Sequence, residues 1–161
     1  MLKEFVTGLS KVLDTIAGLC MVITMALIVI NVILRGIFNR PILGTYEYVG
    51  FLTAVMIGFA LAYCAVQKGH IAVGFIMDRF STRIQAIVNT AMYGIALTFW
   101  TLTAWHLGNY AYRLSVKGVV SPTMQAPFYY FIYLVAIGLL VLCLVLLVEL
   151  IESIKRAAVA R

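Results

Sequence analysis

The chain has 161 residues, of which 64% are hydrophobic and 11% are charged. A water-soluble domain of this length cannot keep so much apolar surface away from water, so the composition excludes that class and predicts an integral membrane protein. The formal net charge of +6 does not indicate nucleic-acid binding. The basic residues are spread between apolar runs, as they are in loops that set membrane orientation.

Four apolar stretches are long enough to cross the hydrocarbon core, which takes about 20 helical residues. They cover about residues 13–34, 46–66, 84–107 and 127–151. The first stretch is longer than the apolar region of a signal peptide and lacks a small-residue cleavage site, so we expect a retained helix. Backbone groups in a single span must bond within that span. The sequence therefore predicts an all-α integral membrane fold, with one domain over residues 1–161.

Lysine and arginine are distributed unequally between the two sides of this predicted membrane protein. The side with both termini and the second connection carries eight of them, and the opposite side carries four. Basic residues are enriched in cytoplasmic loops, so the bias predicts that both termini are inside (N-in/C-in). Tyrosine and tryptophan gather at the outer ends of spans two, three and four, which is typical of the membrane interface.

The inner connection between spans two and three has the pattern of an amphipathic helix. Apolar residues recur at near-helical spacing within residues 67–83, with charged residues off that stripe. This pattern predicts a helix that lies in the cytoplasmic interface, with His70, Asp78 and Arg79 as its polar residues. The N-terminal stretch is similar, with an apolar face that includes Phe5, Val12 and Ile16.

Small residues recur at every fourth position on spans two and three, a spacing that lets membrane helices approach closely. On span two they are Gly50, Ala54, Gly58 and Ala62, and on span three they are Ala86, Thr90, Gly94 and Thr98. We therefore expect spans two and three to pack tightly, on each other or on a partner. Residues 139–148 of span four form a bulky apolar run, which favours a lipid-facing position.

The chain shows no pattern that predicts catalysis or a bound metal or cofactor. The central turns of the spans carry no charged residue or histidine, although such residues mark most transport pathways. His70 and His106 are predicted at opposite membrane surfaces and cannot share a haem, and the three cysteines lack CxxC spacing. Polar residues inside the spans, Asn31 and Asn89 among them, are expected to form interhelical hydrogen bonds.

Short motifs occur in a fixed order along nearly the whole chain. Span two opens with Tyr46-Glu47, and Gly69-His70-Ile71-Ala72-Val73 and Met77-Asp78-Arg79-Phe80 follow it. Pro122 and the run Pro127-Phe128-Tyr129-Tyr130 lead into span four. In this order they resemble the small, DctQ-like membrane subunit of the tripartite ATP-independent periplasmic (TRAP) transporters. Two positions depart from the family pattern, because Tyr48 and Gly74 stand where acids are common.

This resemblance implies a function that the residues alone do not. The chain would be a non-catalytic scaffold subunit of a sodium-coupled importer of organic acids, such as a dicarboxylate or sialic acid. It would lie in the bacterial inner membrane, brace a large elevator-type membrane subunit that holds the sodium and substrate sites, and help to dock a periplasmic substrate-binding protein. No cofactor is expected in this chain itself.

Charged residues at the predicted outer boundary are the candidates for contact with that binding protein: Arg35, Arg40, Glu47, Arg113 and Lys117. The alternative class is a self-assembling exporter of the small multidrug type, which also has four helices. Such exporters use an acid within the first span, and here that span has only Asp14 at its inner edge.

Overall fold

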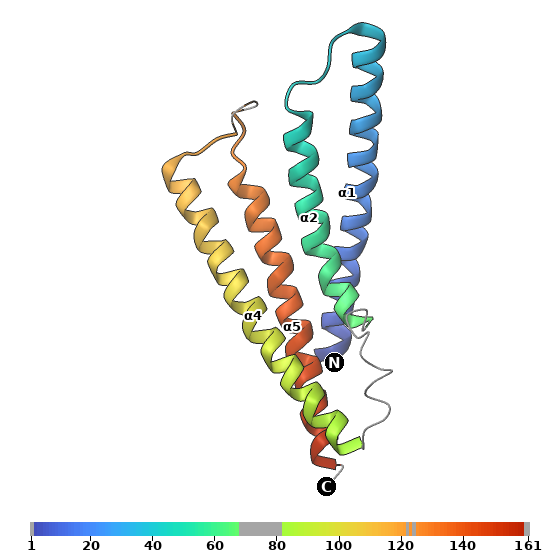
Figure 1. Ribbon diagram of the computed structural model, residues 1–161, viewed down its shortest axis with the longest axis vertical. Helices are drawn as coiled ribbons and strands as arrows, with labels where there is room; N and C mark the ends of the chain where they lie inside the picture. Colours follow the sequence, from blue (N-terminus) through green and yellow to red (C-terminus); the bar gives the residue numbers. More distant parts are fainter. Residues whose placement is uncertain (1, 68–81, 122, 124, 160–161) are drawn as a thin grey trace.

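The computed structural model describes residues 2–67, 82–121, 123 and 125–159, which form four long helices (Figure 1). They are α1 (Leu2–Phe38), α2 (Thr45–Val66), α4 (Thr82–Lys117) and α5 (Tyr129–Val159). Each is long and apolar enough to cross a membrane, and the described residues contain no strand. This confirms the prediction of an all-helical fold with four spans. The predicted interfacial helix lies outside the described residues.

Three of the helices are longer than a membrane crossing requires. α1, α4 and α5 contain 37, 36 and 31 residues, or about 55, 54 and 46 Å at a rise of about 1.5 Å per residue. The 22 residues of α2 match the roughly 30 Å hydrocarbon core. The apolar runs in the sequence therefore marked only the membrane-crossing part of the longer helices.

The helices lie side by side in the order α1–α2–α5–α4 (Figure 1). α5 packs against α4 and α2, α1 packs against α2, and α1 also touches α5. We call the end that carries residues 39–44 and 118–128 the connection end, and the opposite end the terminal end, because both chain termini lie toward it. α4 is the outermost helix on one flank and α1 on the other.

One face of the apolar run of α5 lies in the core of the protein. Its buried side chains include Leu139, Leu142, Val145 and Leu146, with Leu142 only 1% exposed. The opposite face of the run, which includes Leu140, is exposed, so the expectation that the run faces lipid is wrong for its buried face only. Lipid tails and neighbouring helices are equally apolar, so hydropathy cannot tell which of them a bulky side chain contacts.

Two glycines bring the backbones of α2 and α5 into contact. A Cβ atom built on Gly138 would lie 2.5 Å from the carbonyl oxygen of Gly58, and one built on Gly58 would lie 3.2 Å from Cγ1 of Val135. Ala62, one turn further along α2, is completely buried. Small residues thus permit close helix packing, as predicted, but the partner of α2 is α5.

The remaining small residues predicted on spans two and three do not pack α2 against α4. These two helices form no packed interface in the described residues. Gly50 and Ala54 are exposed. On α4, Thr90 Oγ1 lies 2.8 Å from Ser153 Oγ of α5, which confirms an interhelical hydrogen bond. A Cβ built on Gly94 would meet no atom within 4 Å. The side chain of Ala86 is outside the described residues, and exposed Thr98 donates a hydrogen bond to its own helix.

α1 is one continuous helix from Leu2, and the apolar face predicted for its N-terminal stretch is mostly exposed, with Leu13 as its buried member. Phe5 and Val12 are 69% and 57% exposed. The buried row is Val6, Ser10, Leu13 and Ala17, whose spacing of three and four places it on one side of the helix. The Ser10 hydroxyl donates to the Thr7 carbonyl at 3.0 Å, so its burial leaves no unpaired donor.

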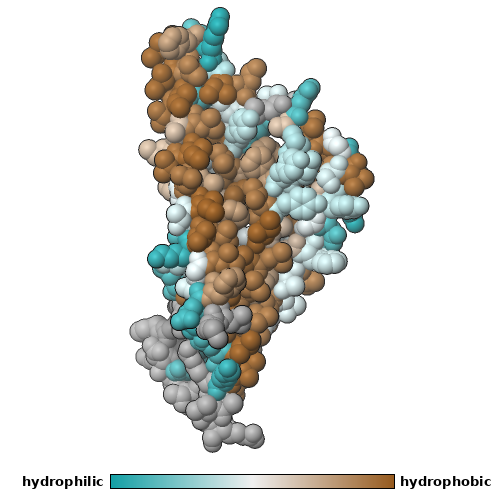
Figure 2. Space-filling model, turned by 180° about the vertical axis from the view of Figure 1, so that it is seen from behind, coloured by the Kyte–Doolittle hydropathy of each residue, from teal (hydrophilic) through white to brown (hydrophobic). Residues whose placement is uncertain are grey.

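Both flanks of the assembly present apolar surface. In the most apolar stretch of α1 only 6% of the residues are buried, and the same share is buried in α4, compared with 44% in α5. Seen from behind, hydrophobic side chains form a continuous surface over the left and centre of the molecule, and the right side, where α4 lies, is paler (Figure 2). In water such a surface would drive aggregation, whereas lipid or a membrane partner can cover it.

The glycine contact gives a stability prediction. Gly138→Ala should destabilise the protein by about 1–3 kcal/mol, because the new methyl group meets backbone rather than a flexible side chain. Gly50→Ala is the matched control, since a Cβ there meets nothing within 4 Å and alanine favours helix. Thermal unfolding of the purified protein in mild detergent measures both. Equal midpoints for the two variants would contradict the proposed contact.

Candidate functional site

The five charged residues expected to contact a partner all lie toward the connection end. Arg35 is in the last turn of α1, Arg40 follows that helix, and Glu47 is in the first turn of α2. Lys117 ends α4, with Arg113 one turn earlier. The four basic side chains are exposed. Because α1 and α4 are the two flanks, the structure separates these cations into two pairs with Glu47 between them (Figure 1).

Glu47 is bonded within the protein. Its carboxylate accepts a hydrogen bond from the Ser121 hydroxyl and one, at 3.3 Å, from the backbone N–H of Thr123. Ser121 is 2% exposed. These contacts tie the start of α2 to the connection between α4 and α5, 74 residues away along the chain. Glu47 therefore shapes the connection end, whatever else it contacts.

Ser121 also organises its own connection. Its N–H donates to the Ala126 carbonyl at 3.0 Å, and its carbonyl accepts from the Gln125 N–H at 2.9 Å. The connection begins at Gly118, whose φ of 60° is left-handed, and the Val119 N–H reaches back to the Leu114 carbonyl at 3.2 Å. Glycine suits this helix-ending conformation because it has no Cβ.

Aromatic stacking joins the same two regions just below the Glu47 contacts. The ring of Phe51 in α2 stacks on Phe131 of α5, with centroids 5.0 Å apart and planes 14° apart. It also stacks on Phe128, with centroids 5.9 Å apart. Such pairs add stability beyond their buried area. These phenylalanine rings thus fix the beginning of α2 against the beginning of α5.

Asn31 holds the other connection. Its side-chain oxygen accepts a hydrogen bond of 2.8 Å from the Ile42 N–H, and the Thr45 hydroxyl donates to the Ile42 carbonyl at 2.8 Å. The prediction of an interhelical hydrogen bond is therefore wrong for Asn31, whose partner is the backbone of a connection. Asn89 is exposed on α4.

An ion pair links the first and last helices at the terminal end. Lys3 Nζ lies 2.7 Å and 2.8 Å from the two carboxylate oxygens of Glu152. Lys3 is 56% exposed and Glu152 is 28% exposed, so the pair contributes at most about 1 kcal/mol. The predicted interfacial residues His70, Asp78 and Arg79 lie outside the described residues.

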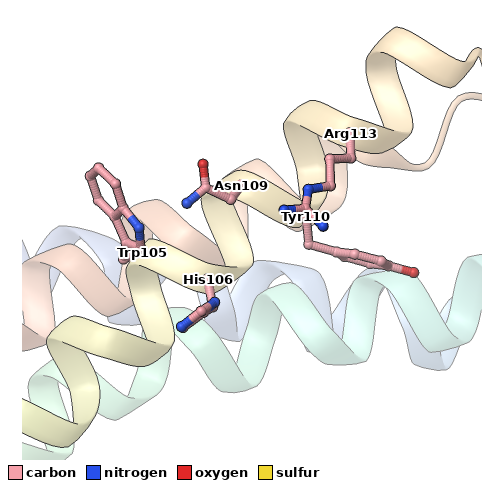
Figure 3. Close-up of a pocket in the computed structure, with 5 residues that line it drawn as sticks. All are labelled: Trp105, His106, Asn109, Tyr110 and Arg113. Carbon is pink, nitrogen blue, oxygen red and sulfur yellow. The ribbon is translucent and has the colours of Figure 1, made fainter.

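A groove occupies the exposed face of α4 toward the connection end. It has a volume of about 470 Å³ and is lined by Trp105, His106, Asn109, Tyr110 and Arg113 (Figure 3). All five side chains project from this single helix. Of these residues only Arg113 was expected to be functional, and its expected part in partner docking stays a prediction. The spacing of the others on one face is the signal that could have identified the groove.

The Glu47 contacts make a prediction about the connection that they hold. Glu47→Ala should speed amide hydrogen exchange around Ser121 and Thr123 by about tenfold or more, because a charge-assisted hydrogen bond contributes about 1.5–3 kcal/mol. Tyr46→Ala is the control, since Tyr46 is 91% exposed. Exchange followed by mass spectrometry in detergent measures both variants. An unchanged rate at residues 118–128 in Glu47→Ala would show that the carboxylate does not hold the connection.

Comparison with known proteins identifies one sequence family and nothing closer. Neither the curated proteins nor the solved structures give a significant match. Residues 24–156 match the family described as "Tripartite ATP-independent periplasmic transporters, DctQ component". This match covers most of the chain, including all of α2, α4 and the two described connections. The chain therefore belongs to the DctQ family and is a multi-pass membrane component of a TRAP transporter.

Proposed function

We propose that this chain is the static scaffold subunit of its transporter and carries no part of the transport pathway. The observation that carries the proposal is the apolar interior of the four packed helices. The packed interface of α2 with α5 consists of glycine, alanine and bulky apolar side chains. The central turns of the described helices carry no charged residue. A pathway for a charged solute needs polar or ionisable groups near the membrane centre.

The exposed flanks support a bracing role. α1 and α4 present apolar side chains along most of their length, and a membrane subunit can cover such a surface as readily as lipid. We propose that a large elevator-type TRAP subunit packs on part of it and supplies the sodium and organic-acid sites. The family membership favours this interpretation over a self-assembling exporter.

We further propose that the connection end faces the periplasm, with both termini in the cytoplasm of a bacterium and the spans in its inner membrane. The lysine and arginine bias supports this orientation. A periplasmic binding protein would then meet the connection end. Arg35 and Arg40 lie at the α1 flank and Lys117 at the α4 flank, so a partner that reaches both pairs covers the whole end. Glu47 would contribute by fixing the connection beneath that partner.

Co-purification tests the scaffold proposal. The tagged chain, expressed in its native background and extracted in mild detergent, should recover one much larger polytopic membrane protein at equal stoichiometry. Proteoliposomes of that protein, with the binding protein present, should take up a dicarboxylate or sialic acid only when this chain and sodium are both added. Full uptake without this chain would refute the scaffold role. Recovery of this chain alone, as a homo-oligomer, would refute the proposal that it binds a large membrane subunit.

Charge reversal tests the docking surface and its side of the membrane. Arg40→Glu combined with Lys117→Glu should weaken docking of the cognate binding protein to the reconstituted complex about tenfold at low salt. The loss should shrink at about 0.5 M salt, where the Debye length is below about 8 Å. Lys11→Glu is the control, because Lys11 is exposed toward the terminal end. Interferometry on nanodiscs measures the affinity. Equal docking by both variants would place the partner elsewhere.

A further inference from the structure

The groove on α4 lies on the side of the helix that faces away from the rest of the protein. Leu102, His106, Asn109 and Arg113 form one row, because residues three and four apart share a helix face. The buried residues of the same helix segment, Ala104, Ala111 and Leu114, lie on the opposite side, where α4 packs on α5. The groove is therefore open to the membrane or to a neighbour within it.

The groove has a polar part and an apolar part. The polar part lies toward the connection end and has a volume of about 470 Å³. An apolar hollow of about 530 Å³ adjoins it toward the middle of α4 and includes Phe99 and Leu102. Both parts are lined by His106 and Tyr110, so they are continuous. From Phe99 to Arg113 the helix rises about 21 Å, which is about half the thickness of a bilayer.

The polar part is rich in hydrogen-bond donors and carries a positive charge. It offers the Arg113 guanidinium, the Trp105 indole N–H and the Asn109 amide (Figure 3). No acidic residue lines either part. Within the described residues, none of these three side chains hydrogen-bonds or ion-pairs with another residue. Their donors are free to bind an anion.

We propose that this groove binds an anionic phospholipid. Its phosphate would accept hydrogen bonds from Arg113, Trp105 and Asn109, and one acyl chain would lie along the hollow at Leu102 and Phe99. The change from polar to apolar along the groove follows the change along a lipid molecule. A lipid with a net negative charge fits better than a zwitterionic one, because no carboxylate is present to pair with a headgroup ammonium. Binding of a protein partner would not require the polarity of the groove to change along its length in this way.

Native mass spectrometry of the purified chain in detergent tests the proposal. Titration with phosphatidylglycerol and with phosphatidylcholine gives the affinity for each lipid. The wild-type chain should bind phosphatidylglycerol about tenfold more tightly, the order expected from one charge-assisted hydrogen bond. Arg113→Gln should abolish most of this preference, and Asn109→Leu should reduce it. Both positions are exposed, so neither substitution disturbs the core.

Arg35→Gln is the matched control, because it removes one exposed arginine from α1, on the other flank. It should keep the preference for phosphatidylglycerol. Equal affinity of the wild-type chain for both lipids, or an equal loss in Arg113→Gln and Arg35→Gln, would overturn the proposal. A third result would also overturn it. If the complex with the large subunit carried no lipid adduct, and Arg113→Gln lowered the yield of that complex, the groove would be occupied by a protein and not by a lipid.

Discussion

Gly58 and Gly138 bring the backbones of α2 and α5 together, and the rest of the fold is arranged around that contact. Between helices in lipid there is little hydrophobic driving force, because the tails are as apolar as the side chains. Dispersion contact over a close approach is what remains, and glycine provides it by removing the Cβ atom. α1 then packs on α2, and α4 packs on α5, so the four helices form a row rather than a closed bundle.

Links on either side of this crossing fix how far α2 and its neighbours can separate. Toward the connection end, Glu47 binds the turn at Ser121, and Phe51 stacks on the beginning of α5. Toward the terminal end, Lys3 pairs with Glu152. The buried side-chain nitrogen and oxygen atoms of the described residues all have hydrogen-bond partners, as they must where water cannot replace a missing bond. The connection end therefore has a defined shape that a soluble partner can recognise.

A row of helices leaves two flanks exposed, and they differ in character. α1 presents exposed apolar side chains such as Leu19, Met25 and Val32. α4 presents a groove whose polarity changes along its length. This asymmetry fits a subunit that meets a larger membrane protein on one side and lipid on the other, which is the arrangement that a bracing role requires.

The sequence by itself determined the class of the protein, the four spans and the family. These follow from the lengths of the apolar runs and the order of the motifs, which are properties of the linear amino-acid sequence. It also identified Gly58 as a packing residue, because small residues at helical spacing have one common use in lipid. Only the tertiary structure decided that Gly58 meets Gly138, that one face of residues 139–148 lies in the core, and that Glu47 binds Ser121. Apolar side chains look alike to lipid and to a neighbouring helix, and a contact across 74 residues exists only once the chain is folded.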